Sequence, residues 1–311
     1  MEIVRNLSQI KSHFRGGAVS IGNFDGVHLG HAALIEQLRL CADKVDGPAV
    51  VFKFDPHPVR VLRPDLTPPP LTWTSRKAEL LEQLHVDMTL VYPTDRALLE
   101  LSAEDFFQNV IVENLGAKAL VEGPNFAFGR DRTGTIDLLQ SLCEDRQIHL
   151  QVVPPCLNGE HFISSSRIRD AITAGEIDFA CEMLTRPYRI RGMVTHGRNR
   201  ATAMGFPTAN LDAIDTLVPA TGVYAGIAWV KDKPYDAAIH IGPNPTFGED
   251  ETKFEVHLLD FHETIYGQIL KVDMISRIRD IRTFEDPELL QSQLKRDIEL
   301  VRQRTQSWNQ R

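Results

Sequence analysis

The pattern of apolar residues changes once along this chain of 311 residues, near Leu184-Thr-Arg-Pro187. Before that point, short β-rich runs alternate with helical stretches, which predicts βαβ units and a parallel sheet covered on both faces. After it, strand-like runs follow one another with Gly, Pro and Asp clusters between them, which predicts an antiparallel barrel or sandwich. The sequence therefore predicts an α/β domain over residues 1–185 and a β domain over residues 186–311.

Within the first half, the strands and helices are predicted from hydrophobic periodicity. The expected strands are 18–21, 49–52, 87–92, 118–121 and 148–153, and the expected helices are 30–42, 75–85, one that Ser102 caps and one between the last two strands. Residues 63–74 contain four prolines, so they are predicted to form a loop.

In the second half, no long helix is expected until the C-terminus. The expected strands are 188–194, 223–230, 235–241, 254–259 and 269–275. Asp286-Pro287 is a favourable N-cap and first-turn pair for a final helix. Its apolar residues fall on one face, which we expect to pack on the barrel: Leu290, Leu294, Ile298 and Val301.

Composition and charge narrow the class of protein. With 42% hydrophobic and 24% charged residues, the chain matches globular proteins rather than disordered ones. The net charge of −8 lacks the positive excess that a phosphate backbone needs, so no nucleic-acid partner is expected. No window is apolar enough for a membrane span or a signal core, so no membrane partner is expected either. Four irregularly spaced cysteines are typical of free thiols, and a cytoplasmic protein is predicted.

The densest chemical signal is the segment from Ile21 to His31, Ile-Gly-Asn-Phe-Asp-Gly-Val-His-Leu-Gly-His. A predicted strand runs through a glycine-containing loop into a helix, a context in which backbone N–H groups and the helix dipole bind phosphates. The chain contains neither a Gly-Lys dipeptide nor Gly-x-Gly-x-x-Gly, which excludes the two common phosphate motifs. His28 and His31 are close enough to face one side of the helix start and neutralise a triphosphate attacked at its α-phosphorus. Structural histidines and a zinc pair are the alternatives, but the His-Glu-x-x-His spacing is absent.

The His28-Leu-Gly-His31 loop resembles that of the nucleotidyltransferase superfamily, and the longer segment resembles its flavin branch, the bacterial bifunctional riboflavin kinase/FAD synthetases. Three further segments match that family in order: Phe54–Pro58, Gly123–Gly129 and Ile163–Arg169. The resemblance implies a Rossmann-like nucleotidyltransferase domain over residues 1–185. It also implies that this domain transfers AMP from ATP to FMN and releases FAD and pyrophosphate.

The same resemblance assigns residues to that reaction. It implies that His28 and His31 contact the ATP phosphates while Ser164, Ser165 and Arg169 close over them. Other family positions that bind the nucleotide and the flavin fall on Gly22, Phe24, Asp25, Gly26, Asp55, His57 and Asn125. The FMN phosphate is already anionic, so catalysis is expected to depend on alignment and charge stabilisation rather than on a strong base.

Motifs in the second half resemble the riboflavin kinase module, a small antiparallel β-barrel. They are Gly205-Phe-Pro-Thr-Ala-Asn210, Gly242–Phe247 and Phe254–Asp260. The resemblance implies that Gly205, Pro207, Thr208 and Asn210 bind the nucleotide. Thr208 and Asn210 would also bind Mg²⁺, since their oxygens are hard donors. Glu255 would be the general base that takes the proton from the ribityl 5′-hydroxyl as it attacks the γ-phosphate of ATP.

One loop departs from this family. Residues Arg198–Met204 carry Ala201-Thr202 where members usually have Gly-Arg. Either the loop takes a different path, with Arg198 or Arg200 supplying the cation, or the kinase is weakened. The sequence thus predicts a bifunctional transferase whose substrates are riboflavin, FMN and ATP with Mg²⁺ and whose product is FAD. The alternatives are a monofunctional FMN adenylyltransferase with an impaired kinase domain and a non-catalytic flavin-binding regulatory protein. The oligomeric state is not predicted.

Overall fold

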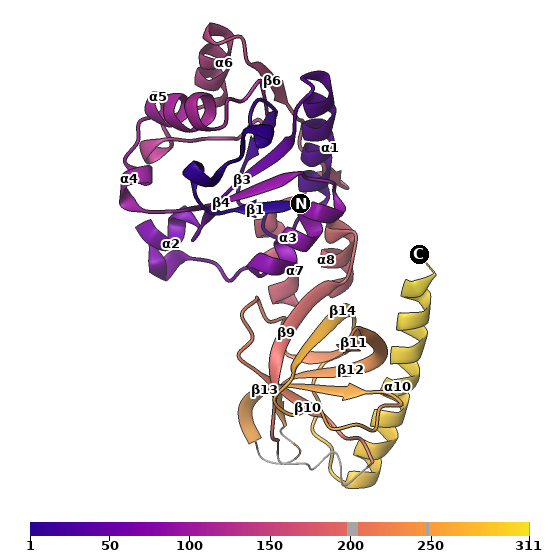
Figure 1. Cartoon of the computed structure of the whole chain (residues 1–311). Helices are drawn as coiled ribbons and strands as arrows, with labels where there is room; N and C mark the ends of the chain where they lie inside the picture. Colours follow the sequence, from indigo (N-terminus) through magenta and orange to yellow (C-terminus); the bar gives the residue numbers. More distant parts are fainter. Residues whose placement is uncertain (198–204, 245, 247–248, 311) are drawn as a thin grey trace. The chain divides into compact units, whose positions relative to one another are not determined.

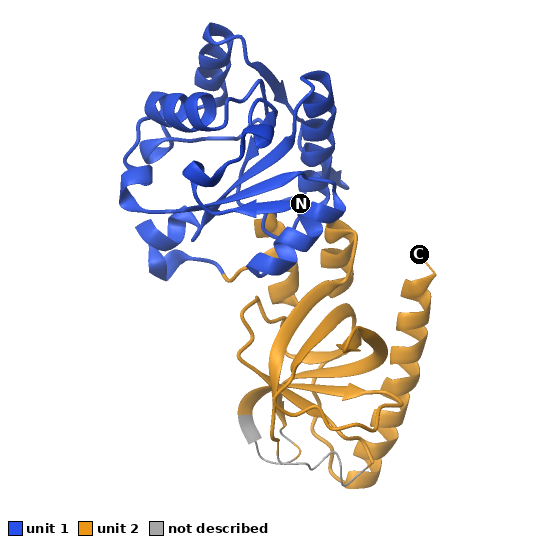
Figure 2. Cartoon of the chain, viewed as in Figure 1, with its two compact units in different colours: residues 1–68, 73–164 blue, residues 69–72, 165–311 orange. Residues whose placement is uncertain are grey.

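The computed structural model describes residues 1–197, 205–244, 246 and 249–310 (Figure 1). The chain forms two compact units (Figure 2). Unit 1 contains Met1–Pro68 and Trp73–Ser164, and unit 2 contains Pro69–Thr72 and Ser165–Arg311. Two helices that precede residue 185, α7 (Ser165–Ala174) and α8 (Ile177–Leu184), therefore group with unit 2. The domain boundary near residue 185 stays a prediction from the sequence.

Unit 1 is built on a parallel sheet with the strand order β1-β4-β3-β2-β5-β6. Its strands are β1 (Glu2–Val4), β2 (Ala18–Ile21), β3 (Ala49–Asp55), β4 (Met88–Pro93), β5 (Ala119–Glu122) and β6 (His149–Val152). The predicted parallel sheet is confirmed, with one addition, because the sequence pattern did not indicate the three-residue edge strand β1.

Helices cover both faces of this sheet, as the alternating pattern predicts. They are α1 (Leu29–Lys44), α2 (Pro58–Leu62), α3 (Thr74–Gln83), α4 (Arg96–Leu99), α5 (Ala103–Phe106) with the π-helical η4 (Phe107–Asn114), and α6 (Ile136–Asp145). Short 3₁₀ segments are Leu7–Gln9, Ser12–Phe14, Pro64–Leu66 and Arg130–Arg132, and β7 (Leu157–Asn158) pairs with β8 (His161–Phe162). Val19 and Phe52 belong to the core cluster on the α5–η4 side, while Ala18 and Val51 belong to the cluster that includes Ile35 of α1. Successive strand residues point to opposite faces, and each face has its own core.

Unit 2 contains a closed antiparallel barrel with the strand order β10-β13-β12-β11-β14-β9. Its strands are β9 (Tyr188–Thr195), β10 (Ala209–Asp212), β11 (Gly222–Val230), β12 (Lys233–Asn244), β13 (Glu249–Leu258) and β14 (Ile269–Arg279). The sequence predicts an antiparallel barrel or a sandwich, and the structure shows the barrel. Hydrogen bonding of β10 to both β9 and β13 closes it, and β10 is a strand that the sequence pattern did not indicate.

The C-terminal helix α10 (Pro287–Asn309) begins where the sequence predicts. Asp286 caps it, because a side-chain oxygen accepts a 2.8 Å hydrogen bond from the backbone N–H of Leu289. Val301 is fully buried against the barrel residues Ala225 and Leu259, which confirms the expected packing of the apolar face. Within the part of the chain that the structure describes, no helix is long and apolar enough to cross a membrane.

Candidate functional site

Three loops of unit 1 meet at one edge of the parallel sheet. They follow β2, β3 and β5, which are neighbours in the order β3-β2-β5, so their carboxyl ends lie side by side. In open α/β sheets, ligands bind in the crevice where the strand order changes direction, and β2 lies at that position here. The edge therefore brings together the predicted residues His28, Asp55 and Asn125.

The loop after β2 has an unusual backbone. Phe24, Gly26 and Val27 have positive φ angles of 49°, 82° and 40°. Only the glycine adopts such angles at low cost, and a β-branched residue such as Val27 rarely does. The side chains of Phe24 and Val27 are buried in the core, which holds the loop in this conformation. Strained backbone of this kind persists where the surrounding structure restrains it, and it is common at functional sites.

His28 and His31 form a stacked pair at the start of α1. Their ring centroids are 3.7 Å apart with 18° between the planes. His28 is the N-cap, and its Nδ1 accepts a 3.4 Å hydrogen bond from the backbone N–H of His31. The neutral imidazole of His28 consequently carries its proton on Nε2. A Cβ at Gly30 would lie 3.2 Å from the Nδ1 and Cε1 atoms of His28, so glycine at this position leaves room for the ring.

Two buried lysines accompany this loop, and sequence reasoning missed both. Lys77 of α3 donates a 2.8 Å hydrogen bond to the carbonyl of Asn23 and forms a 3.6 Å ion pair with Asp25. Lys53 lies 3.5 Å from Asp55. Burial lowers the pKa of Lys77 to about 8, although Asp25 acts in the opposite direction. A lysine within the otherwise apolar run of β3 was the available signal for Lys53, whereas nothing local in the sequence indicated Lys77.

Glu122 is a further residue that sequence reasoning missed. The ladder between β2 and β5 ends at the pair Val19–Leu120, and beyond it Glu122 Oε1 accepts a 2.7 Å hydrogen bond from the N–H of Ile21. The side chain thereby supplies an acceptor to a backbone donor that the sheet no longer pairs. Glu122 is only 2% exposed, and burial raises the pKa of its carboxyl well above the ordinary value.

The remaining predicted residues of this unit occupy the neighbouring loops. His57 caps α2, since its Nδ1 accepts a 3.1 Å hydrogen bond from the N–H of Val59. Asn125 is exposed in a turn that the hydrogen bond from Phe126 N to Gly123 O closes. The Gly22 N–H donates 3.0 Å to Phe52 O, which extends the β2–β3 pairing into the loop.

The predicted serine–arginine segment falls at the division between the units. Ser164 ends unit 1, whereas Ser165 and Arg169 belong to α7 in unit 2. The segment does begin a helix, as expected. Within unit 2, Arg169 Nε donates 2.9 Å to the carbonyl of Pro69. The roles of Ser164, Ser165 and Arg169 toward ATP stay predictions.

In unit 2, four polar residues form a row across the outer face of the barrel. Asn210 of β10 pairs directly with Glu255 of β13 and with Thr195 of β9, and Glu255 pairs with His240 of β12. Directly opposed residues of neighbouring strands project to the same face. The strand residues that come directly before or after these four are buried in the barrel. Because successive residues of a strand point to opposite faces, the row of four lies on the outer face. The predicted general base Glu255 thus lies beside the predicted ligand Asn210.

Glu255 has two polar neighbours that the sequence did not indicate. Asn244 Nδ2 donates a 3.3 Å hydrogen bond to Glu255 Oε2. The ring of His240 donates from Nε2 to Pro243 O at 3.2 Å. Burial lowers the pKa of His240, while the negative charge of Glu255 acts in the opposite direction. Beside Glu255 there is therefore a neutral amide donor and an imidazole whose burial favours the neutral form.

A cavity of about 510 Å³ opens next to this row, and Asn210 is part of its lining. Other lining residues are Thr195, His196, Asp212, Glu251 and Lys253. The ring of His196 stacks on Tyr266 with a centroid distance of 3.9 Å. The cavity has the size of small-molecule sites and carries both cationic and oxygen-bearing side chains.

Thr208 lies in the segment that leads into β10. Gly205 has a φ of 89°, a conformation that favours glycine, and the Pro207 carbonyl accepts a 2.7 Å hydrogen bond from His257 Nδ1. These features fix the segment that carries Thr208 into β10, the strand that contains Asn210. The loop Arg198–Met204, which differs from the family pattern, lies outside the described residues. The same holds for Pro245 and Phe247 of the Gly242–Phe247 motif.

The donor set suits Mg²⁺ that arrives with a nucleotide. Among the described residues, no group of three or more His, Cys, Asp or Glu could hold a metal ion. Thr208 and Asn210 offer a hydroxyl and a carboxamide oxygen, both neutral hard donors. Mg²⁺ in such sites is typically bound by few protein ligands, several waters and the substrate phosphates.

Comparison with known proteins covers nearly the whole chain. The family model for FAD synthetase matches residues 10–167, and that for riboflavin kinase matches residues 184–305. The chain is 33% identical over 303 residues to a bifunctional riboflavin kinase/FMN adenylyltransferase of Pseudomonas fluorescens, covering 97% of each chain. It is also 33% identical over 310 residues to a protein of the same name from Haemophilus influenzae, covering 97% of this chain and 98% of that one. A solved structure described as a macrolide-efflux protein from Streptococcus pneumoniae matches with a TM-score of 0.87 and 32% identity, covering 96% and 98% of the two chains.

Proposed function

The chain belongs to the family of bifunctional riboflavin kinases/FMN adenylyltransferases, and from this premise we propose that its two reactions take place on the two sets of residues described above. The enzyme phosphorylates riboflavin to FMN with one ATP, and it transfers AMP from a second ATP to FMN, giving FAD and pyrophosphate. A monofunctional enzyme and a non-catalytic binding protein are not favoured, because relatives over nearly the whole chain carry the double name.

Adenylyl transfer is assigned to the carboxyl edge of the sheet in unit 1. The first-turn N–H groups of α1 and the stacked histidines receive the ATP phosphates, with His28 donating from Nε2. The FMN phosphate attacks the α-phosphorus, and pyrophosphate leaves. His28 and His31 stabilise the negative charge that builds up on the phosphate oxygens, so no general base is required. The loops of Asp55, His57 and Asn125 border this edge and are assigned to the nucleotide and the flavin.

Phosphorylation of riboflavin is assigned to the outer face of the barrel. Glu255 takes the proton from the ribityl 5′-hydroxyl, whose oxygen attacks the γ-phosphorus of ATP while the bond to the β–γ bridging oxygen breaks and ADP leaves. Asn210, directly opposite on β10, and Thr208 hold the nucleotide phosphates together with the Mg²⁺ that accompanies them. The metal supplies charge neutralisation on the phosphates when bound. The direct pairing of Asn210 with Glu255 is the observation that supports this assignment, since the residues that we assign as base and as phosphate ligand are cross-strand neighbours.

One assay with two variants tests the division of labour. Purified protein is incubated with ATP, Mg²⁺ and either riboflavin or FMN, and the flavins are separated by chromatography. We expect His28→Ala to stop FAD formation from FMN while FMN still forms from riboflavin. We expect Glu255→Gln to stop FMN formation while supplied FMN still becomes FAD. His85→Ala and Glu263→Gln, at exposed positions of the two units, are the matched controls. If either active-site variant removed both activities in a folded protein, the division would be wrong.

We further infer that these reactions take place in the cytoplasm and involve no nucleic-acid or membrane partner. All four cysteines are free in the structure, and three of them are buried. Burial raises the pKa of Cys143 and Cys181 to about 12, so neither forms a reactive thiolate at neutral pH. The net charge of −8 supports the absence of a nucleic-acid partner. Fractionation of cells, with the flavin-forming activity measured in the soluble and membrane pools, tests the location.

A further inference from the structure

We propose that Lys77 is a positioning residue for adenylyl transfer, a buried cation on α3 that holds the Asn23–Asp25 part of the phosphate loop in its active conformation. This inference rests on the proposed role of His28 and His31, because Lys77 acts only through the loop that carries them.

Lys77 touches the loop at two points. Its Nζ donates 2.8 Å to the Asn23 carbonyl, and the same atom lies 3.6 Å from Asp25 Oδ1. The side chains of Lys77 and Asp25 are 6% and 3% exposed, so water does not compete for these contacts. One cation thus fixes a backbone carbonyl and a carboxylate on either side of Phe24, the first residue of this loop with a positive φ.

Burial restrains the side chains of Phe24 and Val27, and Lys77 adds a restraint on a backbone carbonyl and a carboxylate of the same loop. Positive φ angles at Phe24 and Val27 raise the free energy of the loop, and a relaxed backbone would move the residues that follow. His28 comes directly after Val27, and its ring position depends on the backbone at that point. Lys77 comes from a helix 54 residues later in the chain, so its contacts tie the loop to a separate rigid element.

A lysine buried for packing alone would be costly. Its ammonium group is desolvated, and a second cation, that of Lys53, further disfavours its charge. Asp25 and Asp55 are the carboxylates whose charges favour it. Removing the charge from Lys77 would leave Asp25 as a buried carboxylate that has lost this cation, at the centre of the loop.

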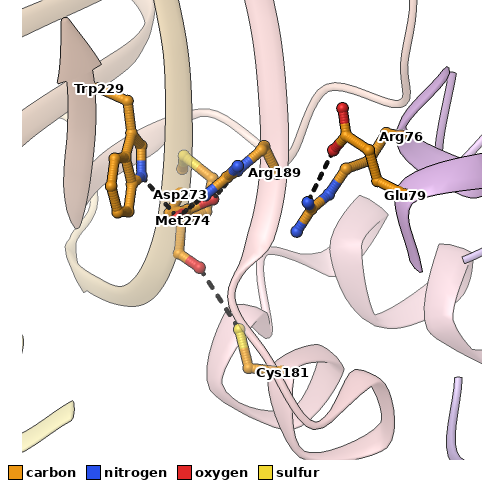
Figure 3. Close-up of polar contacts among 7 residues, drawn as sticks. All are labelled: Arg76, Glu79, Cys181, Arg189, Trp229, Asp273 and Met274. Atoms are coloured by element: carbon orange, nitrogen blue, oxygen red, sulfur yellow. Dashed lines mark hydrogen bonds and ion pairs between the residues drawn. The ribbon is translucent and has the colours of Figure 1, made fainter. Parts of the chain in front are cut away.

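The test compares two Lys77 variants with a neighbouring control. Lys77→Met removes both contacts, and we expect kcat for FAD formation from FMN to fall about 10- to 100-fold, with KM for ATP changed less than about threefold, because misplaced catalytic groups mainly cost rate. Lys77→Arg keeps a cation and should recover part of that loss. Arg76→Met on the same helix removes a cation that pairs with Glu79 of its own helix at 3.0 Å, and it should leave kcat unchanged (Figure 3).

The pH profile of the wild-type enzyme is a second readout that a purely structural lysine would not affect. Lys77 loses its proton above about pH 8, and the ion pair with Asp25 is lost with it. FAD formation should therefore decline above that pH, and Lys77→Arg, whose guanidinium stays protonated, should shift the decline to higher pH. FMN formation from riboflavin, measured in the same samples, should show no such shift.

Two results would overturn the inference. One is a folded Lys77→Met protein with wild-type kcat for FAD formation. The other, which decides the matter if Lys77→Met does not fold, is an alkaline limb that Lys77→Arg leaves unchanged. His28→Ala is measured alongside: if that variant still forms FAD, the proposed site itself is wrong, whereas an inactive His28→Ala with an active Lys77→Met refutes only the role of Lys77.

Discussion

Asn244 Nδ2 donates a 3.3 Å hydrogen bond to Glu255 Oε2, joining the neighbouring strands β12 and β13. The register of these strands shifts between Gly242 and Asn244, so the bond occurs at a β-bulge. Bulges redirect a side chain relative to a regular ladder and are frequent next to active sites. Here the bulge lies beside the carboxylate that we assign as the kinase base.

Asn244→Ala is expected to impair the kinase reaction selectively. Without the amide donor, the Glu255 carboxylate loses a fixed orientation, and kcat for FMN formation should fall about tenfold, the effect of one hydrogen bond to a charged group. FAD formation from supplied FMN is the internal control and should not change. Steady-state rates of both reactions in one preparation provide the measurement. A wild-type kinase rate would show that Asn244 does not orient the base.

Gly30→Ala should separate stability from activity in unit 1. The new Cβ would lie 3.2 Å from the His28 ring, so the ring would have to shift by a few tenths of an ångström relative to His31. Alanine also favours the first turn of α1, by up to about 1 kcal/mol relative to glycine. We expect FAD formation to fall about tenfold, as for other small displacements of catalytic groups, while the free energy of unfolding stays equal or rises. Full activity in this variant would mean that the position of the His28 ring does not matter.

Features that depend on neighbouring residues could be predicted from the sequence. His28 and His31 are three apart at a helix start, so their proximity follows from helix geometry alone. Asp286-Pro287 marked the start of α10 for the same reason, because a cap and its helix are local. The alternation of strands and helices was likewise enough to predict the covered parallel sheet.

Features that depend on distant contacts could not be predicted. Lys77 meets Asn23 across 54 residues, and Glu122 meets Ile21 across 101, so no local pattern links either pair. The strand β10 is only four residues long and was visible as a motif rather than as a strand. Its place between β9 and β13, which aligns Asn210 with Glu255, follows from closure of the barrel.

Asp273→Asn should destabilise unit 2 strongly. The buried carboxylate accepts hydrogen bonds from Arg189 Nε and Trp229 Nε1 at 2.5 and 2.8 Å (Figure 3). Breaking a buried pair costs about 3 kcal/mol or more, which corresponds to a fall in Tm of about 6–12 °C for a unit of this size. Asp260→Asn is the control, because its pair with Arg302 is largely exposed and contributes under about 1 kcal/mol. Scanning calorimetry measures both variants, and equal shifts would contradict the expectation.

Glu122→Gln and Glu122→Leu should differ in their effects on unit 1. Gln keeps an oxygen that accepts the hydrogen bond from Ile21 N–H, so FAD formation should stay near wild type at neutral pH and stability should be no lower than that of wild type. Leu removes the acceptor and leaves a buried N–H without a partner, which costs about 1–3 kcal/mol. Urea unfolding of the two variants measures the difference. A Leu variant as stable as the Gln variant would show that the hydrogen bond to Ile21 contributes little.

The pH dependence of stability should also distinguish Glu122 from glutamine. Burial raises the pKa of the Glu122 carboxyl well above its ordinary value of 4.5. Between pH 4.5 and this raised pKa, the folded chain therefore binds a proton that the unfolded chain has released. The resulting contribution to stability is complete below pH 4.5 and is lost as the pH rises through the folded pKa. Glutamine does not titrate, so the stability of Glu122→Gln relative to wild type should increase as the pH rises above 4.5. A difference in unfolding free energy that stays constant over that range would mean that Glu122 is already ionised in the folded protein.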